Sequence, residues 1–245
     1  MASQSQSTQA SAIQAPATQV LANQSTGIVG LYQSSVGRKL LTGVTGLALV
    51  TFVVGHLLGN LTLLVSASAY NQLAHTIEAL GPLTYTVEFG LSAIALIHAA
   101  IGIKIYIGKR QARPVDYAEY ASAGEPSRQT LSSRTMLISG LVLGAFLVVH
   151  LATFKFGTYY RLPGSSERDL ARLVFETFHK PGYTAGYVLV LSILGLHLRH
   201  GIWSALQSVG VETRPAVYAA SAVLGGAIAI GFIGLPLAIY FGLIG

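Results

Sequence analysis

Residues 40–65 read LLTGVTGLALVTFVVGHLLGNLTLLV and contain no Lys, Arg, Asp or Glu. A run of about 20 apolar residues is long enough to cross the hydrocarbon core of a membrane as a helix. Four further runs of this kind follow, at residues 83–107, 136–154, 183–206 and 216–244, and Pro236 interrupts the last of them. The sequence therefore predicts an all-α membrane protein with five transmembrane helices.

The composition of the 245-residue chain agrees with that prediction. Charged residues make up 10% of the chain, against roughly 25% in a soluble domain, and hydrophobic residues make up 52%. The absence of cysteine excludes disulfides, Cys-ligated zinc, an iron–sulfur cluster held by this chain and thioether-attached haem. The net charge of +6 comes from basic residues that lie between the apolar runs, which is a membrane-topology pattern and does not indicate a nucleic-acid partner.

The charged residues also divide the chain and orient it. Residues 1–37 contain no Lys, Arg, Asp, Glu or His and are predicted to form a polar tail, whereas residues 38–245 form the membrane domain. With the N-terminus inside, ten Lys and Arg residues fall on the inner side and five on the outer side. Because inner loops carry the excess of Lys and Arg, this count favours an inside N-terminus and an outside C-terminus. The outer loop at residues 157–182 is predicted to hold a short amphipathic helix.

Histidines occur in four of the five predicted spans, and their depths form two levels. At about 1.5 Å per residue, His56 and His150 lie ~24 Å and ~22 Å from the inner ends of their spans, whereas His98 and His197 each lie ~14 Å from theirs. An ionisable residue inside a membrane indicates a functional site by default. Imidazoles from different helices at a shared depth are the axial ligands that a b-type haem needs. The pattern therefore predicts two bis-histidine haems, stacked across a four-helix bundle.

Spacing alone does not decide which histidine of the fourth span is the ligand. His200 follows His197 by three residues, so both lie on roughly one face of the helix. Arg199 and His200 are candidates for binding haem propionates or a quinone near the inner surface, and Arg199 is equally interpretable as a topology charge.

Several stretches resemble the cytochrome b subunit of succinate dehydrogenase and fumarate reductase, in its five-helix, di-haem cytochrome b558 branch. The resemblance covers about residues 32–240, and its most specific motif is HLRHGIWSALQ at residues 197–207. The other matching stretches are SSVGRKLLTGVTGL (34–47), GHLLGNL (55–61), VEFGLSAIALIHAAIGIKIY (87–106) and LVVHLATFKF (147–156).

The resemblance implies a function and a set of ligands. It places His56 and His150 on the outer haem and His98 and His197 on the inner one, and it leaves His200 beside the ligands. It implies the membrane anchor of complex II, with a flavoprotein subunit, an iron–sulfur subunit, membrane lipid and a quinone, most plausibly menaquinone, as partners. It also implies an integral protein of the bacterial cytoplasmic membrane.

A quinone that takes up two electrons also takes up two protons, so titratable groups are expected at its site. The candidates at the outer end are His75, Glu78 and Glu88. The candidates at the inner end are Ser34, Ser35, Arg38, Lys39 and His200, although the basic members of this set are equally suited to haem propionates or anionic lipid.

Two other interpretations stay open. One is the di-haem cytochrome b subunit of another membrane oxidoreductase, such as a hydrogenase or a formate dehydrogenase. The other is a haem-free transporter or membrane scaffold that uses the histidines as a proton relay. Transporters tend to have repeated halves and broken spans. This sequence shows no clear internal repeat, and Pro236 alone interrupts a span, which disfavours a transporter.

Overall fold

The computed structural model describes residues 28–112, 131–212 and 214–245. Within these ranges the chain is helical, apart from turns and an isolated β-bridge between Arg161 and Arg168. Five of the helices in the described ranges are long and apolar enough to cross a membrane, which confirms the predicted all-α membrane protein. In chain order the elements are α2 (Ile28–Gln33), α3 (Ser35–Leu61), the 3₁₀ turn η1 (Thr62–Leu64), α4 (Ala67–Ala79), α5 (Pro82–Ala112), α6 (Leu131–Arg134), α7 (Met136–His150), the π-helical turn η2 (Leu151–Lys155), α8 (Leu170–Phe178), α9 (Pro181–Ser208) and α10 (Pro215–Tyr240).

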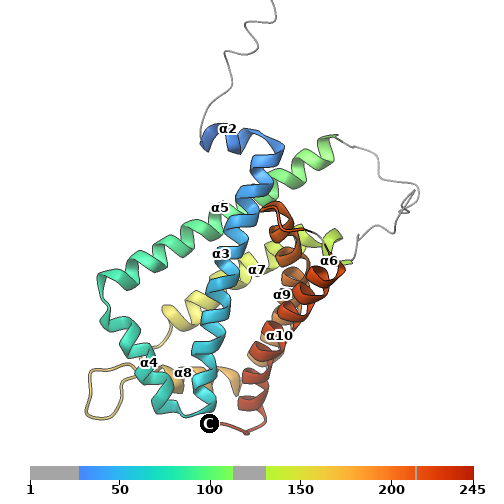
Figure 1. Cartoon of the computed structure of the whole chain (residues 1–245). Coiled ribbons are helices and arrows are strands. Elements are labelled where there is room, and N and C mark those ends of the chain that lie inside the picture. Colours follow the sequence, from blue (N-terminus) through green and yellow to red (C-terminus); the bar gives the residue numbers. More distant parts are fainter. Residues whose placement is uncertain (1–27, 113–130, 213) are drawn as a thin grey trace, which may run out of the picture.

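The helices α3, α5, α7 and α9 form a bundle in which each contacts the next and α9 closes back onto α3. Helix α10 packs outside this bundle against α9 and α3. Figure 1 shows α2 at one end of the molecule, and α4, α8 and the C-terminus at the other end. We refer to these ends as the α2 end and the α4–α8 end.

Small residues bring α9 and α10 into close contact. A Cβ atom built on Gly225 of α10 would lie 2.9 Å from the backbone nitrogen of Arg199, and one on Gly195 of α9 would lie 2.9 Å from the Ala229 side chain. Such close approach of backbones is how membrane helices gain packing energy. Helix α10 continues through the buried Pro236 to Tyr240, so the predicted interruption at this proline is wrong. Neighbouring elements shield the unpaired backbone there, as is common in membrane helices.

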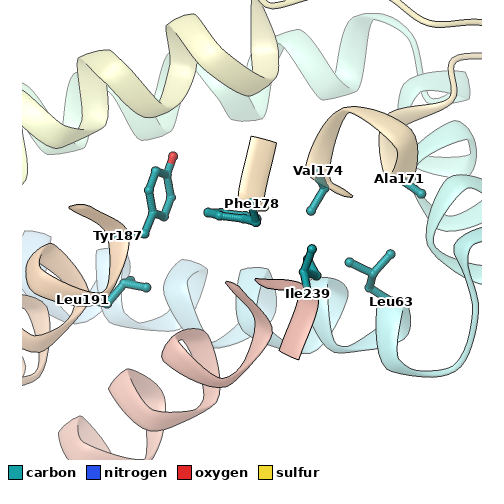
Figure 2. Close-up of a cluster of buried hydrophobic side chains, with 7 residues drawn as sticks. All are labelled: Leu63, Ala171, Val174, Phe178, Tyr187, Leu191 and Ile239. Carbon is teal, nitrogen blue, oxygen red and sulfur yellow. The ribbon is translucent and has the colours of Figure 1, made fainter. Parts of the chain in front are cut away.

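The α4–α8 end is closed by a hydrophobic cluster, shown in Figure 2. Helix α8 is amphipathic and lies where the sequence predicted a short helix, and that prediction is confirmed. Its N-cap is Asp169, whose carboxylate accepts from the Arg172 backbone N–H at 3.1 Å. The buried residues of the cluster come from η1, α8, α9 and α10, and are Leu63, Ala171, Val174, Phe178, Tyr187, Leu191 and Ile239.

The structure adds three helices to the sequence prediction, one of which is the single turn α6 that precedes α7. Helix α4 occupies the first loop at the α4–α8 end, where no helix was predicted, and its N-cap is Ser66. Helix α2 and the first residues of α3 lie within the predicted polar tail, of which residues 1–27 lie outside the described part of the chain. The Ser34 hydroxyl caps α3 by accepting from the Gly37 N–H at 2.9 Å.

Apolar side chains cover the outside of the bundle. Phe89 and Leu96 of α5 are 75% and 72% exposed, and Val148 of α7 is 68% exposed. On a soluble protein such a surface would be unstable, but in a bilayer lipid covers it. The chain is therefore an integral membrane protein whose polar chemistry lies inside the bundle and at its two ends.

Candidate functional site

His56 of α3 and His150 of α7 meet inside the bundle near the α4–α8 end. Their ring centroids are 5.8 Å apart, and the ring planes are perpendicular. Two imidazoles that share one metal ion, with metal–nitrogen bonds of about 2.0–2.1 Å, have their centroids about 6 Å apart. The structure thus brings together the two histidines that depth in the sequence predicted to be partners.

Aromatic rings surround this pair and exclude water from it. Phe52 stacks on His56 at a centroid distance of 5.5 Å, and Phe146 lies 5.6 Å from His150. Phe154 approaches His150 from the η2 turn at 5.3 Å, and Phe232 of α10 lies 5.8 Å from His56. The walls are therefore apolar, as a site for a large planar ligand requires.

Polar groups contact the remaining ring nitrogens of this pair. The Nδ1 atom of His150 lies 3.1 Å from the hydroxyl of Tyr187, so its Nε2 atom is left to face a ligand. The Nε2 atom of His56 lies 3.4 Å from the Asn60 amide, which also donates to the His56 carbonyl at 2.7 Å. The Asn60 contact with Nε2 is long and would have to yield to a ligand at that atom.

His98 of α5 is held by a hydroxyl of α3. The Oγ1 atom of Thr45 lies 3.1 Å from Nδ1 of His98 and donates its own proton to the Leu41 carbonyl at 2.7 Å. With that proton used, the hydroxyl must accept from Nδ1–H of His98. The network therefore assigns the proton to Nδ1 and leaves the lone pair of Nε2 free.

His197 of α9 is held in the same way by α7. The Oγ atom of Ser139 lies 2.9 Å from Nδ1 of His197 and donates to the Met136 carbonyl at 3.1 Å. Gly46 makes room for the His98 ring, since a Cβ there would lie 3.1 Å from Cε1 of His98, whereas a Cβ on Gly140 would make only an ordinary contact with Cε1 of His197, at 3.5 Å.

These four histidines fit axial ligation of haem better than a bare metal site. Within the described ranges no three His, Asp or Glu side chains gather as a bare metal ion would need. Axial haem ligands are instead neutral imidazoles that come in pairs from different helices, because the macrocycle supplies the other four bonds. A ligand imidazole usually donates its second ring N–H to a nearby acceptor, and Thr45 and Ser139 are such acceptors. The residues present therefore fit the group.

The other predicted cofactor contacts lie towards the α2 end. His200 packs beside Trp203, with 5.8 Å between ring centroids. Arg199 points across to α10, where its NH2 group donates to the Tyr218 hydroxyl at 3.1 Å. Arg38 donates from NH1 to the Gln33 carbonyl at 2.8 Å. The Nε atoms of Arg38 and Arg199 are buried and have no hydrogen-bond partner among the described residues.

Two of the quinone candidates of the outer end lie together in the structure. Glu78 lines a half-open surface cavity of about 240 Å³ at the α4–α8 end, together with the exposed side chains of Tyr85, Lys155 and Tyr159. Glu88 forms an ion pair with Lys155 and so reaches the same place.

Two further candidates, His75 and Ser35, do not line this cavity. His75 pairs with Glu167 at 3.4 Å on the exposed surface, with half of its side chain exposed. Ser35 is the exposed first residue of α3, at the α2 end of the molecule.

Several of the contacting residues were missed by sequence reasoning. Lys155 was counted only as a topology charge, although its place five residues after His150 could have indicated the cavity. Thr45, Ser139 and Tyr187 carry no signal until the helices are paired in space.

Comparisons with protein-family models, with curated proteins and with solved structures find no match to this chain.

Proposed function

We propose that this chain is the membrane-anchor cytochrome b subunit of a succinate:quinone oxidoreductase, carrying electrons between an iron–sulfur subunit and a quinone. The observation that carries the proposal is the arrangement of the histidines. His56 and His150 meet towards the α4–α8 end, whereas His98 and His197, by their positions along α5 and α9, lie closer to the α2 end. The motifs around these residues, and above all residues 197–207, supply the resemblance to that family.

Two haem b groups bound at these pairs would supply reversible one-electron redox chemistry. The chain itself provides neutral imidazoles at fixed positions, because Thr45 and Ser139 hold the protonated ring nitrogens of His98 and His197. The aromatic rings around His56 and His150 exclude water from that level. Pairs stacked at two depths make a path across most of the membrane.

The α2 end suits the soluble partners. Basic residues gather there on the first turn of α3 and the last turn of α5, among them Arg38, Lys39, Lys109 and Arg110. By the positive-inside rule this end faces the cytoplasm of a bacterium. The iron–sulfur subunit, with the flavoprotein behind it, would dock at this end, and the inner pair would receive its electrons.

The cavity at the α4–α8 end suits the quinone. Lys155 and Tyr159 are donors for quinone oxygens, and Glu78 is a carboxyl that exchanges protons with the surface. The ion pair with Glu88 orients the Lys155 ammonium group. The cavity opens beside η2, which directly follows His150, so a quinone there lies next to the outer pair. Menaquinone is the quinone that the family resemblance favours.

The proposal is tested by purifying the tagged chain from its native membranes in mild detergent. We expect a flavin-bearing subunit and an iron–sulfur subunit to copurify, and we expect succinate to reduce the b-type haem of the complex. Copurification with hydrogenase or formate dehydrogenase subunits, and no reduction by succinate, would identify a different di-haem cytochrome. A chain purified without haem would leave only a transporter or a scaffold.

A further inference from the structure

Helices α3 and α7 share a sequence pattern, and each uses a hydroxyl residue of this pattern to contact a histidine of another helix. Residues 45–57 read TGLALVTFVVGHL and residues 139–151 read SGLVLGAFLVVHL, with seven identical residues in thirteen positions. The shared positions include the glycine after the hydroxyl residue, the phenylalanine four residues before the histidine, and the histidine itself. The chain therefore does contain an internal repeat, contrary to the expectation from its sequence.

Equivalent residues of the repeat make equivalent contacts. Thr45 contacts His98 at 3.1 Å, and Ser139 contacts His197 at 2.9 Å. Phe52 packs on His56 at 5.5 Å, and Phe146 packs on His150 at 5.6 Å. Helices α3 and α7 thus each carry a histidine near the α4–α8 end. Eleven residues before that histidine, each carries a hydroxyl residue that contacts the histidine of α5 or α9.

The bundle consists of two similar helical hairpins, α3–α5 and α7–α9. Helices α3 and α7 run from the α2 end towards the α4–α8 end, and helices α5 and α9 run back (Figure 1). The two hairpins therefore have the same topology and the same direction along the bundle. Each hairpin then provides one histidine to each level. Because the repeated positions are the histidines and their contacts, the repeat gives no support to a transporter.

We infer that Thr45 and Ser139 are matched positioning residues for the inner histidine pair. Each hydroxyl donates its proton to a backbone carbonyl of its own helix, and it therefore accepts a hydrogen bond from Nδ1–H of the facing imidazole. This fixes the tautomer of His98 and His197 and leaves the Nε2 lone pair of both rings available to a ligand. The inference rests on the proposed function, since it assigns a role at the inner haem.

The hydrogen bond has an electronic consequence that packing alone lacks. An acceptor on Nδ1–H makes the imidazole a stronger donor at Nε2, which stabilises the oxidised form of a metal bound there. Removing either acceptor should therefore raise the reduction potential of the inner haem. The outer haem should keep its potential, because neither hydroxyl contacts His56 or His150 among the described contacts.

The test is a spectroscopic redox titration of the purified complex with the variants Thr45→Val, Ser139→Ala and the double variant. We expect one of the two haem components to shift to higher potential in each single variant and further in the double variant. Thr45→Ser and Ser139→Thr retain the acceptor and should restore the original potential. Thr51→Val is the matched control, because the Thr51 hydroxyl also donates to a carbonyl one turn back but is exposed.

The outcomes separate this inference from the proposed function. Two haems in the unaltered complex, with neither potential moved by the double variant, would overturn the inference and leave the function standing. Equal shifts of both haems, or the same shift in Thr51→Val, would also overturn it. Loss of the inner haem alone in Thr45→Val, with retention in Thr45→Ser, would support it. An unaltered chain that purifies without haem would overturn both.

Discussion

At the scale of single residues, the decisive fact is what each ring nitrogen contacts. His98, His150 and His197 each have a hydroxyl at Nδ1, contributed by Thr45, Tyr187 and Ser139. A histidine buried for packing alone would need both of its ring nitrogens satisfied, because an unpaired buried polar group costs about 1–3 kcal/mol. Satisfying Nδ1 and leaving Nε2 open is instead the arrangement that a metal ligand requires.

Substitutions of His200 and His197 test which histidine of α9 is the ligand. It lies beside Trp203, whereas His197 faces Ser139 of α7. We expect His200→Ala to retain both haems and His197→Ala to lose the inner one, as measured by the pyridine haemochrome content per chain. Loss of the inner haem in His200→Ala, with His197→Ala unaffected, would exchange their roles.

Lys155 and Glu78 test the quinone cavity. We expect Lys155→Gln or Glu78→Gln to lower quinone reduction by about tenfold or more, the usual size of a lost charge-assisted contact or proton donor. Steady-state assays with a quinone analogue measure this, and the haem spectrum should not change. His75→Gln is the control, because His75 pairs with Glu167 away from the cavity. Equal losses in all three variants would place the quinone elsewhere.

At the scale of elements, α4 and α8 close one end of the bundle through polar contacts that a sequence does not reveal. The Asn71 side chain is 5% exposed, accepts from the Ala171 N–H at 2.8 Å and donates to Asp169 at 2.9 Å. It ties the first turn of α8 to α4 across a long stretch of chain. The amphipathic pattern of α8 predicted the helix, but not this attachment.

Asn71→Ala should destabilise this end. The change leaves the Ala171 N–H buried without its acceptor, and we expect a loss of about 1–3 kcal/mol. The thermal unfolding temperature of the detergent-solubilised protein should fall, and Gln72→Ala at the exposed neighbouring position should leave it unchanged. An unchanged temperature in Asn71→Ala would show that the α4–α8 contact carries no stability.

The contacts of Glu176 in α8 predict that the stability of the fold depends on pH. Hydrogen bonds from Tyr160 and Arg172 lower the pKa of its carboxyl below the ordinary value of 4.5. A lowered pKa in the folded state means that the ionised form stabilises the fold, and this stability is present above about pH 4.5 and lost as pH falls through the lowered pKa. The unfolding temperatures of the wild type and Glu176→Gln should therefore differ near neutral pH and converge in acid. A constant difference across the range would contradict the assignment.

At the scale of the whole molecule, the spans and the contact between His56 and His150 follow from the sequence, whereas the side-chain environment does not. Hydropathy locates the crossing helices because lipid demands about 20 apolar residues in each of them. Depth along those helices pairs His56 with His150, because rise per residue is fixed. The contacts of Thr45 with His98 depend on how two helices rotate about their axes, which hydropathy does not fix. The cavity at Lys155 depends likewise on the π-helical turn after His150.

The predicted orientation is testable because the chain contains no cysteine. Single cysteines at Gln207, at the α2 end of α9, and at Ser165, in the loop before α8, give probes for the two sides. In intact cells we expect a membrane-impermeant maleimide to label Ser165→Cys at once and Gln207→Cys only after permeabilisation. The reverse pattern would invert the molecule in its membrane.

The proposed electron path requires that the four histidines hold haem as two pairs, and a single spectroscopic experiment tests this requirement. It is the reduced-minus-oxidised spectrum, with redox titration, of the wild type and of His56→Ala, His150→Ala, His98→Ala and His197→Ala. We expect two b-type components in the wild type, one of them absent from both His56→Ala and His150→Ala, and the other absent from both His98→Ala and His197→Ala. No b-type band in the wild type, or a single component lost in all four folded variants, would contradict the account.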